Sequence, residues 1–172
     1  MRYIWYPLCY SFLGFCGEVL FARVTGAGKR DRKCHLLLPV CPVYGLGAAA
    51  ILALPPPVTG HLLPLFAASA LLASAAEYAL SLFYEKAWGV SFWSYAGMPG
   101  NLHGRICPAF SLLWGALGVA LVRFVHPLVA GLVERLPPLL DLPALLVFWA
   151  DFLLTTLLLR RNPSTRTLIW YR

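Results

Sequence analysis

The chain has 172 residues, of which 60% are hydrophobic and only 12% are charged. An ordinary soluble domain is about 25% charged, so this composition excludes a typical soluble protein and predicts an integral membrane protein. The net charge of +7 does not indicate nucleic-acid binding, because the basic residues gather in loops on one side of the predicted membrane segments.

Five apolar segments follow one another along the chain, each near the roughly 20 residues that a helix needs to cross a bilayer. They cover residues 3–22, 43–59, 61–83, 106–125 and 142–159. The first follows Arg2 as a signal peptide would, but it contains Glu18 and has no small-residue cleavage site, so we expect a retained helix. The sequence therefore predicts an all-α, polytopic helix bundle of about five transmembrane helices, forming one transmembrane domain over residues 1–160.

The distribution of lysine and arginine predicts the orientation of this bundle. Eleven of the 14 fall on one side of a five-span arrangement and three on the other. The eleven are Arg23, Lys29, Arg30, Arg32, Lys33, Lys86, Arg105, Arg160, Arg161, Arg166 and Arg172, and the three are Arg2, Arg123 and Arg135. Because basic residues prefer the cytoplasmic side, we expect an external N-terminus and a cytoplasmic tail at residues 161–172.

Three further patterns concern the organisation of the chain. Residues 126–143 are too short and too charged to cross a bilayer, so we expect an external amphipathic or re-entrant segment. A carboxylate, a cytoplasmic loop, a Cys-Pro pair and a small-residue helix occur in that order in residues 3–60 and again in 61–125, which suggests a parallel repeat. The five cysteines lack metal-site spacing, so we predict no metal site, and we predict no cofactor. Cys34 and Cys41 would lie on the reducing cytoplasmic side, so we expect no structural disulfide.

Three carboxylates interrupt the apolar segments. Glu18, Glu77 and Asp151 lie roughly 8, 10 and 13 Å from the cytoplasmic ends of their segments at about 1.5 Å per residue. Ionisable side chains at membrane depth are costly and usually face a bundle interior, a partner or a water-filled cavity. We therefore predict that these three carboxylates face one another in the cytoplasmic half of the membrane.

The stretch after Glu77 extends this polar constellation. Ser81 and Glu85 lie four and eight residues after Glu77, on the same face of a helix. The loop over residues 88–105 then adds aromatic and polar side chains, among them Arg105 as the natural counter-charge for a buried glutamate. We predict one polar pocket, and its candidate ligand-binding residues are Glu18, Tyr44, Glu77, Ser81, Glu85, Trp93, Tyr95, Asn101, Arg105 and Asp151.

Three interpretations of the constellation are open. It could bind a small polar or cationic molecule, or protons; it could only lock helices together, as interhelical polar contacts do; or it could serve an intramembrane enzyme using Glu77 and Glu85. The sequence contains no P-loop, HExxH or GxSxG motif, so nothing marks it as an enzyme.

Several stretches resemble one known family. "YSFLGFCGEVLF", "PVCPVYGLGA", "EYALSLFYEKAWGVSFWSYAGMPGNLHGRIC" and "FVHP" are similar to the CmpB-like family of small bacterial membrane proteins, described as putative ABC-transporter type IV or putative ABC transporter permease. The resemblance covers roughly residues 3–160. Its most specific part is the pattern carried by Glu77, Glu85, Trp93, Tyr95, Asn101, Gly104, Arg105, Ile106 and Cys107. Where the family pattern has an acidic residue before the tyrosine, this chain has Ser94.

The resemblance implies a multi-pass protein of the bacterial inner membrane with a role in transport. Because the sequence has no nucleotide-binding motif, an ATPase would be a separate subunit. Five helices make a thin wall for a pathway, so a homodimer or a partner subunit is expected. The alternative is a membrane scaffold or lipid-interacting protein that does not transport. The sequence does not identify a substrate, a transport direction or an energy source.

Overall fold

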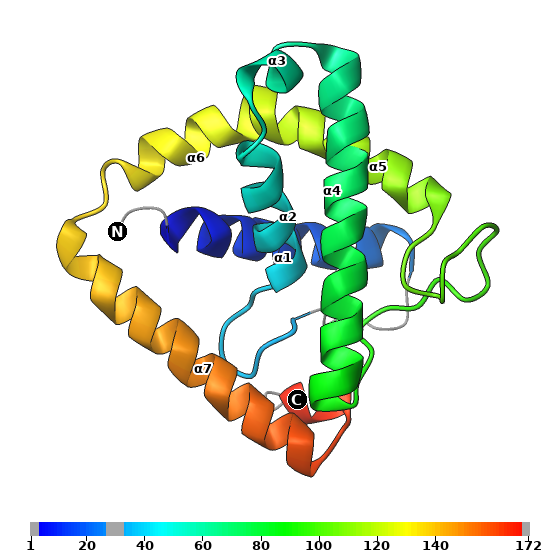
Figure 1. Ribbon diagram of the computed structural model, residues 1–172. Coiled ribbons are helices and arrows are strands. Elements are labelled where there is room, and N and C mark those ends of the chain that lie inside the picture. The colour runs from blue at the N-terminus through cyan, green and yellow to red at the C-terminus, as the bar shows by residue number, and fades with distance from the viewer. Residues whose placement is uncertain (1–3, 27–32, 170–172) are drawn as a thin grey trace.

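The computed structural model describes residues 4–26 and 33–169, and within these ranges the chain is helical with no strand (Figure 1). Lys29, Arg30 and Arg32 of the basic loop, together with Arg2 and Arg172, lie outside the described residues. The elements are α1 (Trp5–Val24), α2 (Pro42–Leu52), α3 (Pro56–Thr59), α4 (Leu62–Phe83), η2 (Tyr84–Trp88), α5 (Pro108–Ala120), η3 (Leu121–Val125), α6 (His126–Val133), η4 (Pro138–Leu140), α7 (Asp141–Arg161) and η5 (Thr165–Leu168).

Proline sets the start of two helices that follow loops. Pro42 and Pro108 each occupy the first turn of a helix, α2 and α5, after an extended cysteine. Proline suits this position because its fixed φ is already helical and its missing N–H would have no partner there. The two Cys-Pro pairs noted in the sequence are thus both helix N-termini. The parallel repeat built on them stays a prediction.

Four helices are long and apolar enough to cross a membrane: Trp5–Val24, Leu62–Trp88, Pro108–Val133 and Pro138–Arg161. The fifth predicted segment contains α2, which is apolar but has only 11 residues. It stops there because the three prolines at positions 55–57 interrupt the helix before α3. The all-α, multi-pass prediction is confirmed, with one helix shorter than expected. The orientation of the chain stays a prediction.

Residues 126–143 do not form the separate external segment predicted from the sequence. Residues 126–133 continue the helix that begins at Pro108. Pro127 stands in the first turn of α6, and the helix continues past it. Residues 138–143 instead belong to the start of the last long helix. The charges at Glu134 and Arg135 fall in the short connection between the two.

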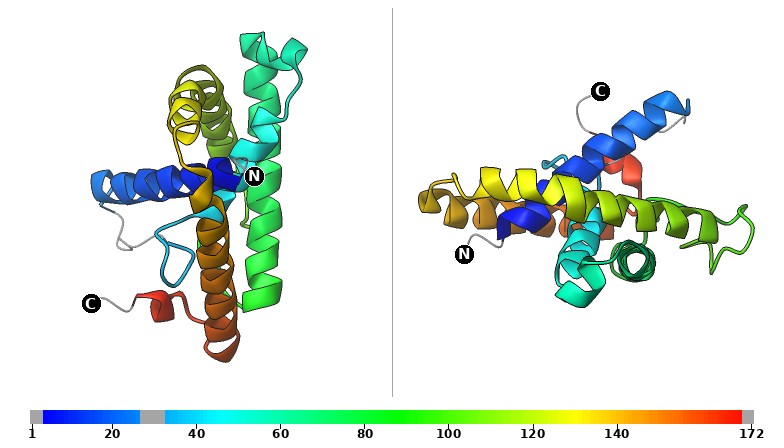
Figure 2. Two further views of the ribbon diagram at one scale, coloured as in Figure 1. Left: turned by 90° about the vertical axis from the view of Figure 1, so that its left-hand side faces the viewer. Right: turned by 90° about the horizontal axis from the view of Figure 1, so that it is seen from above.

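The long helices cross one another rather than run side by side. The helix formed by α5 and α6 crosses α4 in Figure 1, as does α1, and α1 lies across α7 in the left view of Figure 2. Gly118 of α5 lies where a Cβ would overlap the Ser69 side chain of α4. Small residues of this kind let two helix backbones approach closely. The largest helix contacts are between α4 and α5, α1 and α2, and α2 and α4.

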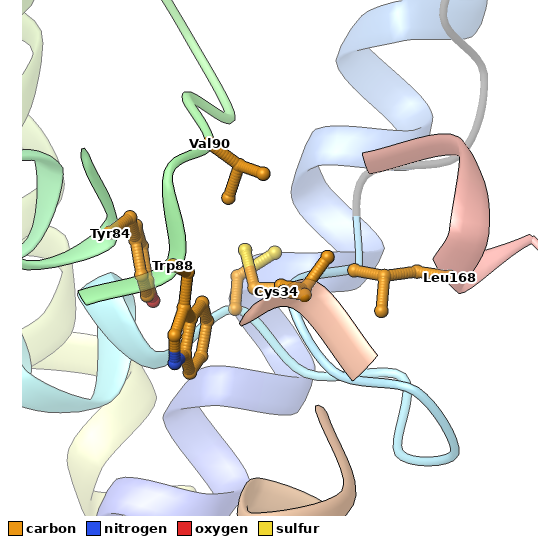
Figure 3. Packing of buried hydrophobic residues seen from close by; sticks show 7 residues of the cluster. Cys34, Tyr84, Trp88, Val90 and Leu168 are labelled. Carbon is orange, nitrogen blue, oxygen red and sulfur yellow. The ribbon is translucent and has the colours of Figure 1, made fainter. Parts of the chain in front are cut away.

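Buried apolar side chains form two clusters. One joins Tyr84, Trp88 and Val90 to Cys34 and Leu168, so it ties the end of α4 to the segment before α2 and to the C-terminal region (Figure 3). The other joins Tyr10 of α1 and Ala48 of α2 to Val129 and Val133 of α6. Elsewhere the helices expose many leucines, among them those at 63, 71, 128 and 139, as expected of surfaces that face lipid.

Candidate functional site

Glu77 is the most deeply buried of the predicted glutamates. Its side chain is 3% exposed, on α4 among alanine and leucine. The Tyr95 hydroxyl donates to Oε1 over 2.7 Å, and the indole N–H of Trp114 donates to Oε2 over 2.9 Å. Within the described residues, no lysine, arginine or histidine forms an ion pair with Glu77. The carboxylate is therefore held by two neutral donors, one from a loop and one from α5.

Glu18 and Tyr44 form a second pair beside it. The Tyr44 hydroxyl donates to Glu18 Oε1 over 2.7 Å, which joins α2 to α1. The Tyr44 ring packs edge-on against the Trp114 ring, with 5.3 Å between centroids. Because Tyr44 binds one glutamate and Trp114 the other, their ring contact links the two pairs. We call Glu18, Tyr44, Glu77, Tyr95 and Trp114 the carboxylate cluster.

The charges of this cluster act on one another. Glu18 interacts unfavourably with Glu77, since both would be negative. Burial raises the pKa of Tyr95, which lies in the loop outside the long helices, and the neighbouring Glu77 carboxylate raises it further. The Tyr95 hydroxyl therefore keeps its proton and remains a donor to Glu77. A negative Glu77 held by two neutral donors would be relieved by a proton or a cation.

The loop between Trp88 and Pro108 positions Tyr95 by its own hydrogen bonds. Tyr95 N donates to Gly104 O over 2.8 Å. Asn101 donates to Met98 O over 2.8 Å and accepts from Gly104 N over 2.8 Å. Trp93 donates its indole N–H to Arg105 O over 3.1 Å. Asn101 and Trp93, both predicted to bind a ligand, thus shape the loop that presents Tyr95.

Arg105 does not serve as the counter-charge for the buried glutamate. It pairs with Glu85, whose side chain is 56% exposed, and its guanidinium lies 5.5 Å from the Tyr78 ring centroid. The reason is helix geometry: Glu85 lies in η2, more than two turns beyond Glu77, where α4 reaches the surface. Ser81, one turn after Glu77, is buried at 8% exposure.

Asp151 belongs to a different site. It is fully buried and accepts from the backbone N–H groups of Leu37 (2.9 Å, Oδ1) and Leu38 (2.8 Å, Oδ2). Thr155, one turn on, accepts from Leu36 N over 2.9 Å, and His35 Nδ1 lies 3.5 Å from Asp151 Oδ2. This carboxylate therefore fixes the backbone of the segment before α2, and the three predicted carboxylates do not share one pocket.

Trp114 is the cluster member that sequence reasoning missed. The available signal was an indole N–H in the middle of an otherwise apolar helix, since a buried tryptophan usually finds an acceptor. The structure also describes two cavities, of about 200 and 320 Å³, and no member of the carboxylate cluster lines either of them.

Comparison with known proteins gives one match. A family model described as Putative ABC-transporter type IV matches residues 5–157, which is most of the chain and includes all five members of the carboxylate cluster. Neither a curated protein nor a solved structure matches the chain.

Proposed function

We propose a function for this chain as a member of the family described as Putative ABC-transporter type IV, to which it belongs. It is a multi-pass membrane protein. In our proposal it is the membrane-embedded permease or substrate-binding subunit of an ABC-type transport system in the bacterial inner membrane. The carboxylate cluster is the place where it receives a proton or the cationic group of a small polar ligand.

One observation carries this proposal. Glu77 is 3% exposed, lies in a long apolar helix and is compensated by two neutral donors. A buried charge normally requires a counter-charge, and without one the group takes up a proton instead. Glu18 nearby adds a second negative charge. The cluster is thus poised to accept positive charge.

The arrangement of the donors suggests how a ligand would enter. Trp114 and Tyr44 stand on helices, whereas Tyr95 stands on the 89–107 loop. A cation that replaced the Tyr95 hydroxyl at Glu77 Oε1 would need to move only this loop. Tyr95 would then act as the cover of the site, and the helix-borne residues as its fixed wall.

The partners follow from the same proposal. The chain has no nucleotide-binding motif, so a separate ATPase subunit would supply energy at the cytoplasmic side. Few helices are long enough to cross a membrane in the part of the chain that the structure describes, so in this proposal a second copy or another membrane subunit would complete the wall.

A second candidate is a scaffold in which the cluster only joins helices. It is favoured by the fact that both Glu77 oxygens already accept hydrogen bonds, from the loop and from α5. It is also favoured by the two cavities, which lie away from the cluster. Polar contacts of this kind hold membrane helices together without binding anything.

Thermal unfolding of the purified protein in mild detergent separates the two. The probes are Na⁺, Mg²⁺, spermidine and a pH series, applied to the wild type, Glu77→Gln and the matched control Glu85→Gln. A ligand at about 100 times its Kd stabilises a protein by about 2.7 kcal/mol. We expect a probe to stabilise the wild type and Glu85→Gln but not Glu77→Gln.

The scaffold predicts a different pattern. No probe would stabilise the wild type, and Glu77→Gln would only lower its thermal stability. Identification of the proteins that co-purify from native membranes tests the transport system independently. A stoichiometric ATPase is expected, and its absence would contradict the ABC-type assembly.

A further inference from the structure

Two adjoining apolar cavities lie between α7 and the helices α1, α2 and α4. They measure about 200 and 320 Å³, and both are lined by Pro42, Phe148 and Trp149. The smaller is otherwise mostly aromatic, with Trp88 and Phe152 in its wall. We call the two together the α7 groove. It is separate from the carboxylate cluster.

The groove exists because α7 is held at a few points instead of along its length. At its start, the Trp5 indole N–H donates to Asp141 Oδ1 over 2.8 Å. At its middle, Asp151 binds the segment before α2. Farther on, the Trp88 indole N–H donates to Thr156 Oγ1 over 3.0 Å. Between Asp141 and Asp151 no such bond is described, and Trp149 is 51% exposed.

The lining indicates what fills the groove. A stable water site needs two to four polar partners. Apart from Ser11 in the larger cavity and His35, which is turned to Asp151, the walls are aromatic rings and aliphatic carbon. A second transmembrane helix would need small residues along the whole groove for close approach. Ser11, Gly45 and Ala49 line the larger cavity, but the aromatic cavity has none in its lining. A hydrocarbon chain meets both conditions, because it is narrow, flexible and needs no hydrogen bond.

Basic residues at one end of the groove indicate the rest of the ligand. Arg160 Nε donates to Ala87 O over 3.2 Å. Ala87 directly precedes Trp88, which lines the smaller cavity, so the Arg160 guanidinium lies close to that cavity. Lys86 and Arg161 flank the same point and are exposed. Basic pockets between membrane helices bind anionic lipid headgroups. No acidic side chain of the carboxylate cluster lines the groove.

We propose that the α7 groove is a binding site for a phospholipid with an anionic headgroup. One acyl chain lies against Trp149 between α7 and α2, and the headgroup lies at Lys86, Arg160 and Arg161. The lipid then fills the space that keeps α7 apart from the other helices.

Fluorescence quenching by brominated lipids tests this site. The protein is reconstituted in phosphatidylcholine vesicles containing a small fraction of either phosphatidylglycerol or phosphatidylcholine brominated on the acyl chain. Quenching that is lost in Trp149→Phe reports a chain in the groove. We expect stronger Trp149 quenching by the brominated phosphatidylglycerol than by the brominated phosphatidylcholine.

Charge variants locate the headgroup. Lys86→Gln combined with Arg161→Gln leaves the Arg160 contact intact, and Arg135→Gln is the control at a distant basic residue. Each basic residue near an anionic lipid changes affinity on the order of fivefold, so the double variant should lose the preference for phosphatidylglycerol while the control keeps it.

Two outcomes would overturn the proposal. Equal quenching by the two lipids in the wild type would show ordinary contact with the bilayer. Quenching that is unchanged in Trp149→Phe would show that lipid does not enter the groove, as when a second copy of the chain covers it.

Discussion

Gly14 lies where α1 packs against Tyr44 of α2, and replacing it by alanine tests the packing that positions the carboxylate cluster. The new Cβ would lie 2.5 Å from the Cβ of Tyr44 and closer still to its ring. The Tyr44 Cβ is bonded directly to the backbone, so no rotamer of Tyr44 removes this overlap. We therefore expect α2 to move away from α1.

The magnitude follows from three contributions. Overpacking a close contact costs about 1–3 kcal/mol. Movement of α2 also breaks the 2.7 Å bond from Tyr44 to Glu18, and a hydrogen bond to a charged group contributes about 1.5–3 kcal/mol. Alanine returns about 1 kcal/mol through its better helix propensity. We expect Gly14→Ala to lower the free energy of unfolding by about 1.5–5 kcal/mol.

Gly17 is the matched control on the same helix, since a Cβ there would meet nothing within 4 Å. Both variants and the wild type would be unfolded thermally in the same detergent, followed by tryptophan fluorescence. Gly17→Ala should be as stable as the wild type or slightly more so. If Gly14→Ala proves equally stable, the contact between α1 and α2 is not as close as described and this reasoning is refuted.

Three other substitutions are predicted to separate structural from peripheral contacts, each measured by thermal unfolding. Asp151→Asn should lower stability by about 1–3 kcal/mol, because its amide turns a donor toward a buried backbone N–H, whereas Asp141→Asn still offers an acceptor and should cost less. Tyr95→Phe leaves a buried carboxylate oxygen without its donor and should cost about 1–3 kcal/mol, against about 0.5 kcal/mol or less for Tyr78→Phe. Arg105→Gln breaks an ion pair with a mostly exposed carboxylate and should cost about 0.2–1 kcal/mol; a much larger loss would show that Arg105 supports the cluster.

The sequence predicted the membrane class and most of the carboxylate cluster, because both depend on composition and on the expense of burying charge. Glu18, Tyr44, Glu77 and Tyr95 all belong to the polar pocket that the sequence predicts. The structure pairs Tyr44 with Glu18 and Tyr95 with Glu77. Periodicity places a side chain on a helix face but does not say which helix that face meets. For this reason Trp114 was missed.

The same limit explains why Asp151 was assigned to the wrong group of contacts. Its depth along a helix could be counted from the sequence, and the count resembled those for Glu18 and Glu77. Two of its partners are the backbone N–H groups of Leu37 and Leu38. Every residue except proline carries such a group, so no side-chain pattern marks these two. The predicted segment at residues 43–59 was longer than α2 for a different reason. Prolines 55–57 end the helix but are not polar, so the apolar composition extends beyond Leu52.

The bond between Asp151 and the segment before α2 has a consequence for how the protein is made. Asp151 stands ten residues from either end of α7, the last long helix, yet its two oxygens satisfy backbone groups more than 110 positions earlier in the chain. During synthesis those N–H groups emerge long before their acceptor. Helices α1 and α4 can therefore enter the membrane early, but residues 36–38 gain their side-chain acceptors only when α7 arrives. A chain released before α7 would lack the acceptors for these three N–H groups, so a truncated copy would leave backbone groups unbonded that a complete copy satisfies.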